Sequence, residues 1–261
     1  MQLSTALLSL LCVSLSQVHA TPAPSALPHA PLPQSILADT PLQTHITDPQ
    51  VAGSSTSGFK IPTRNESTVL ARRLLAKSKT GVLSTIFPSN ITSPYVPRAV
   101  ANTPIGLPDY IASCEEPTGN PTLLALTIST STRNAVAGSN VSLAISWWDE
   151  YLKITHSEPW SAANLPRASL VGWLEEMSKE DVEAADVVRC FTGVHGDSKM
   201  WLPGDEGAAH HGVWMRMVVE QVYWIGGFGD RAFIGWFDPE VWRGVTVEDW
   251  EAVRLPGEKK P

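Results

Sequence analysis

The chain has 261 residues, of which 43% are hydrophobic and 17% are charged, and its formal net charge is −7. This composition is too apolar for a chain that is disordered throughout, and the length is enough for one substantial core or two small ones. The acidic balance argues against nucleic-acid binding, because contacts to phosphates need a basic face.

The first twenty residues have the pattern of a secretory signal peptide. Met1–Ala20 contains no Asp, Glu, Lys or Arg, and its apolar run Leu7–Leu15 is much shorter than the roughly 20 residues that span a bilayer. The small or short side chains at 18–20 predict cleavage after Ala20. No later segment is apolar enough to cross a membrane, so the sequence predicts a soluble mature chain that is extracellular or lies in the vacuolar lumen.

Cysteine and asparagine patterns agree with the secretory pathway. Cleavage removes Cys12 and leaves Cys114 and Cys190. An even pair in an oxidising compartment predicts a disulfide, with two buried free thiols as the alternative. Three N-glycosylation sequons predict a glycoprotein; they begin at Asn65, Asn90 and Asn140.

Residues 21–62 are rich in proline and poor in charge, holding eight of the 21 prolines. Such a segment buries too little apolar surface to offset its ordering entropy, so we expect a disordered linker or a propeptide. The folded domain is expected over 63–255, with a tail over 256–261. The dibasic pair Arg72-Arg73 is a second candidate for processing, but its helical surroundings favour a solvated helix face.

A helix is predicted first, over Glu66–Lys77. Its apolar residues fall at helical spacing, Asn65 or Ser67 is the expected cap, and Gly81 the expected end. The apolar period then changes to two, which predicts about six strands that close into a sheet or barrel. The strands are expected over 82–87, 122–130, 141–147, 168–174, 213–225 and 231–237, with short helices over 133–138, 178–189 and 246–254.

Two loops resemble known sites at first sight. A cluster of histidines and carboxylates could bind a metal, but its spacing fits no familiar ligand pattern and a solvated polar loop is favoured; the cluster is His195, Asp197, Asp205, Glu206, His210 and His211. Gly226–Gly229 lacks the spacing and the following helix of a phosphate loop, so a hairpin turn is favoured.

Other candidate chemistry is sparse. The ten tryptophans are expected mainly in the core, and Trp148, Trp160 and Trp201 are the candidates for ligand contact. No G-x-S-x-G elbow supports a hydrolase. The acidic residues over 175–183 are interpreted as a solvated face.

A family resemblance covers roughly Glu66–Arg243. Ala71–Leu75 followed by Gly81–Ile86 resembles the opening of the pyridoxamine 5'-phosphate oxidase-like FMN-binding split barrels, and within them the CREG (cellular-repressor) group of secreted glycoproteins. Further segments resemble later motifs of that group in the same order along the chain; they are Pro104–Tyr110, Leu124–Asn134, Ser139–Leu143, Cys190–Pro203 and His211–Gly227.

The resemblance implies a mainly β fold with peripheral helices (α+β): a six-stranded, Greek-key split β-barrel of the FMN-binding type, commonly a homodimer with flavin sites at its interface. Flavin-using relatives hold the phosphate with Arg and Lys on the second strand and a Ser-Arg-Lys group at the short helix. Here the second strand, Leu107–Ala112, has neither base. Ser129, Thr132 and Arg133 remain as a degenerate FMN-phosphate site, because Asn134 stands at the Lys position.

Three functions therefore stay open. The favoured one is a secreted, non-catalytic CREG-like glycoprotein that acts through ligand or protein binding and needs no cofactor. The alternatives are an FMN-dependent oxidoreductase using Ser129, Thr132 and Arg133, and another ligand-binding or enzymatic use of the barrel. No residue is singled out as an acid, base, nucleophile or metal ligand.

Overall fold

The computed structural model describes residues 60–208 and 210–259. The predicted signal peptide and nearly all of the predicted linker lie outside the described residues. Across these two ranges, no helix combines the length and apolarity needed to cross a membrane.

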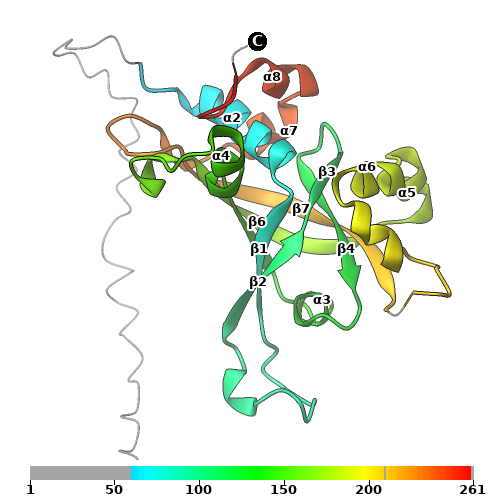
Figure 1. The fold of residues 1–261 in the computed structure, drawn as a ribbon. Coiled ribbons are helices and arrows are strands. Elements are labelled where there is room, and N and C mark those ends of the chain that lie inside the picture. Colours follow the sequence, from blue (N-terminus) through cyan, green and yellow to red (C-terminus); the bar gives the residue numbers. More distant parts are fainter. Residues whose placement is uncertain (1–59, 209, 260–261) are drawn as a thin grey trace, which may run out of the picture. The chain divides into compact units, whose positions relative to one another are not determined.

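The chain folds into a mainly antiparallel sheet that curls into a half-barrel with helices around it (Figure 1), which confirms the expected fold class. The strands are β1 (Thr80–Ile86), β2 (Pro104–Tyr110), β3 (Ala112–Glu115), β4 (Asn120–Leu126), β5 (Val141–Ser146), β6 (Arg167–Glu176), β7 (Gly212–Ile225) and β8 (Ile234–Trp236). The α-helices are α2 (Arg64–Lys77), α3 (Thr130–Val136), α4 (Trp148–Thr155), α5 (Lys179–Ala184), α6 (Val187–Val194), α7 (Pro239–Gly244) and α8 (Val247–Ala252). Short 3-10 turns form η1 (Arg98–Val100), η2 (Ala162–Asn164) and η3 (Gly196–Trp201).

The strand order explains the curl. The sheet runs β2-β1-β5-β6-β7-β4-β3, with β8 paired to β7, so it has eight strands where about six were predicted. The strands β2 and β3 lie at opposite ends of this order, yet only Ile111 separates them in sequence. Two edges joined by one residue must lie close together, so the sheet has to bend round on itself. The backbone N–H of Ile111 donates to the Lys79 carbonyl at 2.9 Å, which holds this corner.

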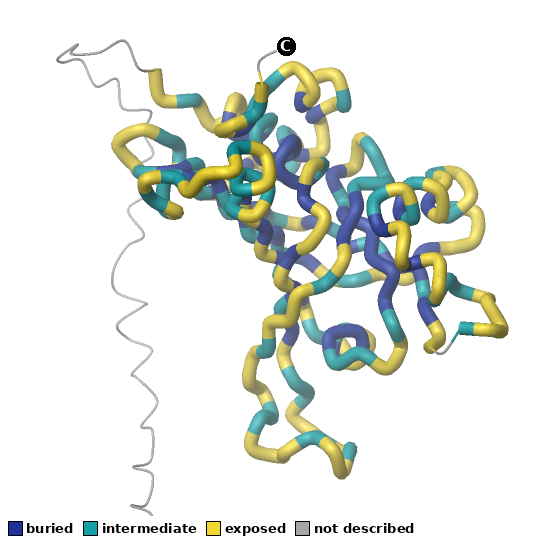
Figure 2. Tube along the Cα trace, in the orientation of Figure 1, coloured by how far each residue is buried: buried dark blue, intermediate teal, exposed yellow. Residues whose placement is uncertain are grey.

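The apolar alternation predicted for 141–147 places its side chains in the core. Val141, Leu143, Ile145 and Trp147 are all buried, and they pack with α2 in the larger of two hydrophobic clusters. Each fully buried aliphatic side chain contributes about 1.5–3 kcal/mol. A smaller cluster lies under α5 and α6. Figure 2 shows the buried positions running along the strands, while the end of the β1–β2 hairpin is exposed.

The first helix differs from the prediction at both ends. Thr63 is its N-cap and forms a capping box, in which the Glu66 side chain accepts from Thr63 N at 2.7 Å. Asn65 and Ser67, the predicted caps, are the second and fourth residues of the helix itself. The helix ends at Lys77, because Gly81 already belongs to β1.

Three other predicted boundaries need correction. The helix expected over 178–189 is two helices, because Asp186 adopts a left-handed conformation with φ of 47° between α5 and α6. The strand expected over 122–130 stops at Leu126, because Ser129 caps the next helix. The last strand is only three residues long. The capping boundary at Thr246, in contrast, is confirmed by its reciprocal bonds with Asp249.

The interpretation of Arg72 and Arg73 as a solvated helix face is wrong. Arg72 is 0% exposed and Arg73 is 6% exposed. Arg72 Nη1 donates to the carbonyls of Trp242 at 2.8 Å and Val245 at 3.2 Å, and Arg73 Nη1 donates to the carbonyl of Trp250 at 3.1 Å. These carbonyls belong to the ends of α7 and α8, where a helix leaves its last acceptors without backbone partners. The two arginines therefore terminate short helices that pack against α2.

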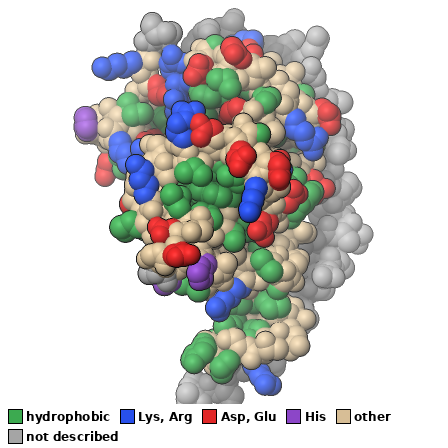
Figure 3. All heavy atoms as spheres, turned by 90° about the vertical axis from the view of Figure 1, so that its right-hand side faces the viewer, with side chains coloured by type: hydrophobic (Ala, Val, Ile, Leu, Met, Phe, Trp, Pro, Cys, Tyr) green, Lys and Arg blue, Asp and Glu red, His purple; other side chains and the backbone are tan. Residues whose placement is uncertain are grey.

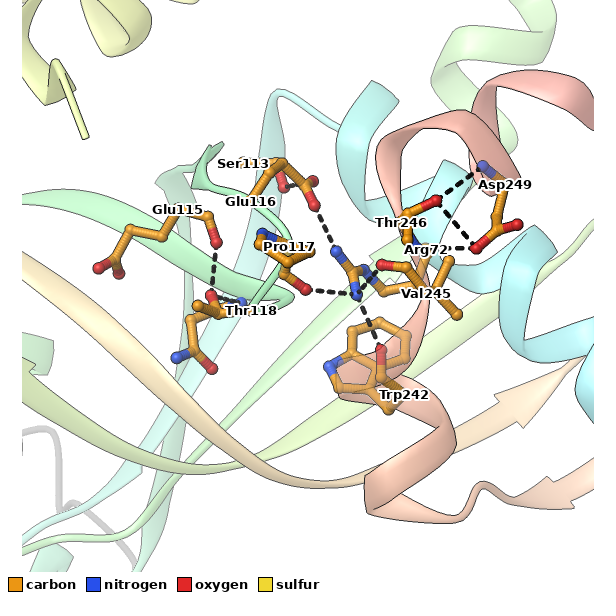
Figure 4. A network of polar contacts seen from close by, with 11 residues as sticks. Arg72, Ser113, Glu115, Glu116, Pro117, Thr118, Trp242, Val245, Thr246 and Asp249 are labelled. Carbon is orange, nitrogen blue, oxygen red and sulfur yellow. Dashed lines mark hydrogen bonds and ion pairs between the residues drawn. The ribbon is translucent and has the colours of Figure 1, made fainter. Parts of the chain in front are cut away.

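Carboxylates complete this region, which we call the α2 anchor (Arg72, Arg73, Glu116 and Glu258). Arg72 Nη2 is paired with Glu116, and Nη1 also donates to the Pro117 carbonyl at 3.0 Å, as Figure 4 shows. Arg73 binds both oxygens of Glu258, at 2.6 and 2.7 Å. The C-terminal segment that carries Glu258 is therefore fastened to the first helix of the domain.

The predicted disulfide is confirmed. Cys114 in β3 and Cys190 in α6 are bonded, with an S–S distance of 2.08 Å, and the two residues are 76 positions apart in sequence. The bond ties α6 to one edge of the sheet. Figure 3 views the face that carries α5 and α6, where charged side chains of both signs surround a central group of hydrophobic ones.

Candidate functional site

A hollow of about 300 Å³ lies where β2 and β4 approach each other at the start of α3. We call it the mouth hollow and define it by its lining residues, which are Leu107, Pro108, Asp109, Tyr110, Leu124, Leu126, Ser129, Ser131 and Trp201. Its walls are mainly apolar and aromatic, which is typical of small-molecule sites, and its volume lies at the lower end of their range.

Local structure positions the polar members of this hollow. Asp109 lies opposite Gly81 in the β1–β2 ladder. Ser129 follows β4 and caps α3, since its Oγ accepts from Thr132 N at 3.1 Å. The helix is held on the sheet by Asn134, whose Nδ2 donates to Thr85 Oγ1 at 3.0 Å. The residue at the position of the family's lysine thus has a packing role here.

The structure brings together two of the three predicted phosphate ligands. The Ser129 and Thr132 hydroxyl oxygens lie 2.7 Å apart and are hydrogen-bonded to each other. Ser129 lines the mouth hollow, whereas Thr132 is buried and does not. Arg133 is exposed and is also absent from the lining. The assignment of these three residues to FMN phosphate stays a prediction.

Asp109 gives the hollow its electrostatic character. Burial raises the pKa of its carboxyl, opposed by the backbone hydrogen bond that Asp109 Oδ1 accepts from Tyr110 N at 2.9 Å. The shift means that this environment already disfavours negative charge. None of the nine lining residues, all of them described, is Lys or Arg.

These residues do not fit the phosphate of FMN. A phosphate needs several charge-assisted donors to offset its desolvation, and it carries close to two negative charges at neutral pH. The mouth hollow offers a carboxyl and the uncharged hydroxyls of Ser129 and Ser131, and the Ser129 hydroxyl is already hydrogen-bonded to Thr132. The start of α3 adds only uncharged backbone N–H donors, and the capping hydroxyl already takes that of Thr132.

Tyr110, which lines the mouth hollow, belongs to an aromatic stack behind it. The Tyr110 ring lies 4.2 Å from the His195 ring, with 8° between their planes. Tyr110 Oη donates to Asp197 at 2.9 Å, and this bond to a carboxylate raises the pKa of Tyr110. His195 is buried, with Nε2 2.9 Å from the Ile111 carbonyl oxygen. The expectation of a solvated loop is therefore wrong for His195, which instead packs between β2 and α6.

The other candidates from the sequence are the metal cluster, the glycine-rich turn and three tryptophans. Among the residues that the structure describes, no three His, Cys, Asp or Glu side chains are grouped to hold a metal ion. Gly226–Gly229 forms the turn between β7 and β8, with Gly227 at φ 146°, which confirms the hairpin prediction. Of the suspected tryptophans, Trp201 lines the mouth hollow, Trp148 lines a different hollow, and Trp160 is exposed beside Phe228.

Sequence reasoning missed the role of Asp109 and Tyr110. The sequence places both residues in the Pro104–Tyr110 family motif and on a second strand that lacks the family's bases. The signal in the sequence was an acidic residue on the inward-facing side of an edge strand. Such a carboxylate needs either a cationic partner or access to solvent through an open hollow.

The fold and this geometry define a split-barrel protein. A family described as CREG, beta-barrel matches residues 62–244. The match covers more than half of the chain, so the chain belongs to the CREG β-barrel family. No curated protein matches the sequence.

One solved structure with a TM-score above 0.5 shares the fold. A heme-binding protein from Mycobacterium smegmatis is similar at 17% identity and TM-score 0.51, covering 70% of this chain and 61% of that one. The chain thus spans less than two thirds of that relative. A protein of unknown function from Agrobacterium tumefaciens has 22% identity and TM-score 0.46, with 66% and 63% covered. A Listeria innocua protein named as a pyridoxamine 5'-phosphate oxidase has 12% identity and TM-score 0.37, with 62% and 98% covered.

Proposed function

We propose that this CREG-family chain is a secreted glycoprotein that acts by binding a ligand or a protein rather than by catalysis. The observation that carries the proposal is the Asp109 carboxyl in a hollow whose lining residues include no cation. Such a hollow favours neutral or hydrogen-bond-donating groups over a phosphate. Its apolar and aromatic walls supply the area that binding would bury.

Secretion and glycosylation are part of this proposal. A disulfide between Cys114 and Cys190 suits an oxidising compartment. The sequon asparagines Asn65, Asn90 and Asn140 are all exposed, as glycan attachment requires. The homodimer that the family resemblance implies is proposed as well, and sedimentation of the purified chain tests it.

The second candidate is an FMN-dependent oxidoreductase. Its supporting observation is that a hollow does lie beside Ser129 and Ser131, at the start of the short helix. FMN would supply the redox chemistry, and the chain would only bind and orient it. This candidate requires Arg133, which is exposed, to reach the phosphate.

One experiment separates the two candidates. The mature chain, purified from a secreting host, is examined by visible absorbance and then titrated with FMN, with flavin fluorescence as the readout. We expect a colourless protein that leaves FMN fluorescence unchanged. A yellow protein, or quenching at micromolar FMN that Arg133→Ala weakens, would establish the flavin-binding alternative.

A further inference from the structure

The carboxyl of Asp109 in the mouth hollow has no cationic partner. No Lys, Arg or His side chain of the described residues forms an ion pair with it. Its Oδ1 accepts from Tyr110 N at 2.9 Å, which is an uncharged donor. A half-buried carboxylate without a cation is costly for the fold, and a charged group from outside the chain would offset that cost.

The neighbours of Asp109 in the sheet explain why its carboxyl is unpaired. Gly81 lies directly across the β1–β2 ladder and has no side chain. Leu107, two residues earlier on the same side of β2, is apolar and also lines the hollow. Neither neighbour can take up the charge of the carboxylate, so the charge faces the hollow.

Two aromatic side chains, Tyr110 and Trp201, line the hollow together with Asp109. One face of the Tyr110 ring is covered by His195, with 4.2 Å between the ring centroids, so a ligand can contact the opposite face or the edge. The negative face of an aromatic ring attracts cations, and indole does so most strongly. A carboxylate beside two aromatic side chains is therefore a combination that suits an organic cation.

The rest of the hollow limits the size and polarity of a ligand. Leu124 and Leu126 provide apolar surface, and the hydroxyls of Ser129 and Ser131 lie at the start of α3. An ammonium group has three N–H donors, so it can bind a carboxylate and a hydroxyl oxygen at the same time. The volume of about 300 Å³ suits a small ligand whose body is apolar.

We propose that the mouth hollow binds a small, apolar primary amine as its ammonium ion, with the ammonium on Asp109 and the apolar body against Leu126 and Trp201. The single positive charge matches the single carboxylate, whereas a phosphate would add close to two negative charges. Burial raises the pKa of Asp109, and a bound ammonium opposes that shift by stabilising the ionised form. The inference rests on the proposed function, because both need a hollow that is open to a ligand.

Calorimetric titration of the purified mature chain with phenethylamine tests the proposal. Phenethyl alcohol is the neutral control with the same ring, and phenylacetate is the anionic one. We expect phenethylamine to bind at least about tenfold more tightly than the alcohol, and phenylacetate to bind most weakly. Asp109→Asn keeps the size of the side chain and should remove the preference for the amine. Asp230→Asn, at an exposed aspartate outside the lining, should change none of the three affinities.

A second variant tests the aromatic wall independently of the carboxylate. Trp201→Leu keeps the wall apolar but removes its aromatic face. It should therefore weaken phenethylamine by about two- to fivefold and weaken the alcohol less.

The outcomes separate this inference from the proposed function. Equal affinity of the native chain for phenethylamine and phenethyl alcohol would overturn the inference, and the hollow would remain a site for neutral ligands. Absence of binding by all three ligands would overturn it as well, and the FMN titration then decides the proposed function separately. A native dimer that fails to bind phenethylamine and dissociates in Asp109→Asn would also overturn it, because a lysine of the second copy would then pair with the carboxylate.

Discussion

Two regions of the molecule hold charged side chains out of water, and they differ in what surrounds the charge. In the α2 anchor, burial lowers the pKa of Arg72 and Glu116 opposes that shift, while three backbone carbonyls share the two N–H donors of Nη1. In the mouth hollow, burial raises the pKa of Asp109 and no cationic side chain lines the wall. Arg72 is a paired charge that stabilises the fold, whereas Asp109 is an unpaired charge that a ligand can bind.

The largest expected effect comes from breaking the anchor. Arg72→Ala leaves Glu116 without its cation and three buried carbonyls without their hydrogen-bond donor. We therefore expect the free energy of unfolding to fall by about 3–5 kcal/mol. Urea denaturation measures it. Arg98→Ala, at an exposed arginine with no ion pair among the described residues, is the control and should stay within about 0.5 kcal/mol of native. Equal stability of Arg72→Ala and the control would contradict the anchor.

A smaller effect is expected where the C-terminal segment joins the anchor. Glu258→Gln keeps one acceptor but loses the charge that Arg73 binds with two hydrogen bonds, so we expect a loss of about 1–2 kcal/mol at pH 7. The exposed neighbour Glu251→Gln is the matched control and should cost little.

The pH dependence of that loss has a definite sign. Burial alone would raise the pKa of Glu258, but the bonds from Arg73 and from Leu255 N outweigh it and hold the pKa below its usual value. The contribution of the ionised group is therefore complete above the unfolded pKa of about 4.3, and it disappears as the pH falls through the lower folded value. A native–variant difference that instead grows below pH 4 would refute this pairing.

The smallest effect is expected in the mouth hollow, with the opposite sign. Because the folded pKa of Asp109 is raised, its ionisation opposes folding above that pKa. Asp109→Asn should therefore stabilise the chain slightly at pH 7, and the gain should disappear below the unfolded value of about 3.9. Thermal melts between pH 3 and pH 7 measure the difference, with exposed Asp230→Asn as the control. A destabilised Asp109→Asn at pH 7 would show that the carboxylate has a partner.

The pattern of local residues predicted much of the fold. Alternation over 141–147 identified a core strand, and the spacing of Thr246 and Asp249 identified a helix start, because both depend on neighbours in sequence. Arg72 and Arg73 were misread for the opposite reason. Their partners lie 44 to 185 positions away along the chain, so helical periodicity alone left them on the solvent side.

The candidate sites show the same limit. Family motifs located Ser129 and Thr132 at one helix start, and the structure brings their hydroxyls together. Asp109 lies in the mouth hollow only because β2 bends towards β4, which no pattern of neighbouring residues indicates. The burial of a single charged residue by distant segments does not change the hydrophobic periodicity of its own segment.

We infer that the mouth hollow has no place for a phosphate, and a comparison of FMN with riboflavin measures this directly. The two ligands share the ring and the ribityl chain and differ only in the phosphate, so the ratio of their dissociation constants reports the phosphate contacts alone. Equilibrium titration of the native chain should show FMN binding no more tightly than riboflavin. A tenfold or greater preference for FMN would contradict the account and return Ser129, Thr132 and Arg133 to the role of phosphate ligands.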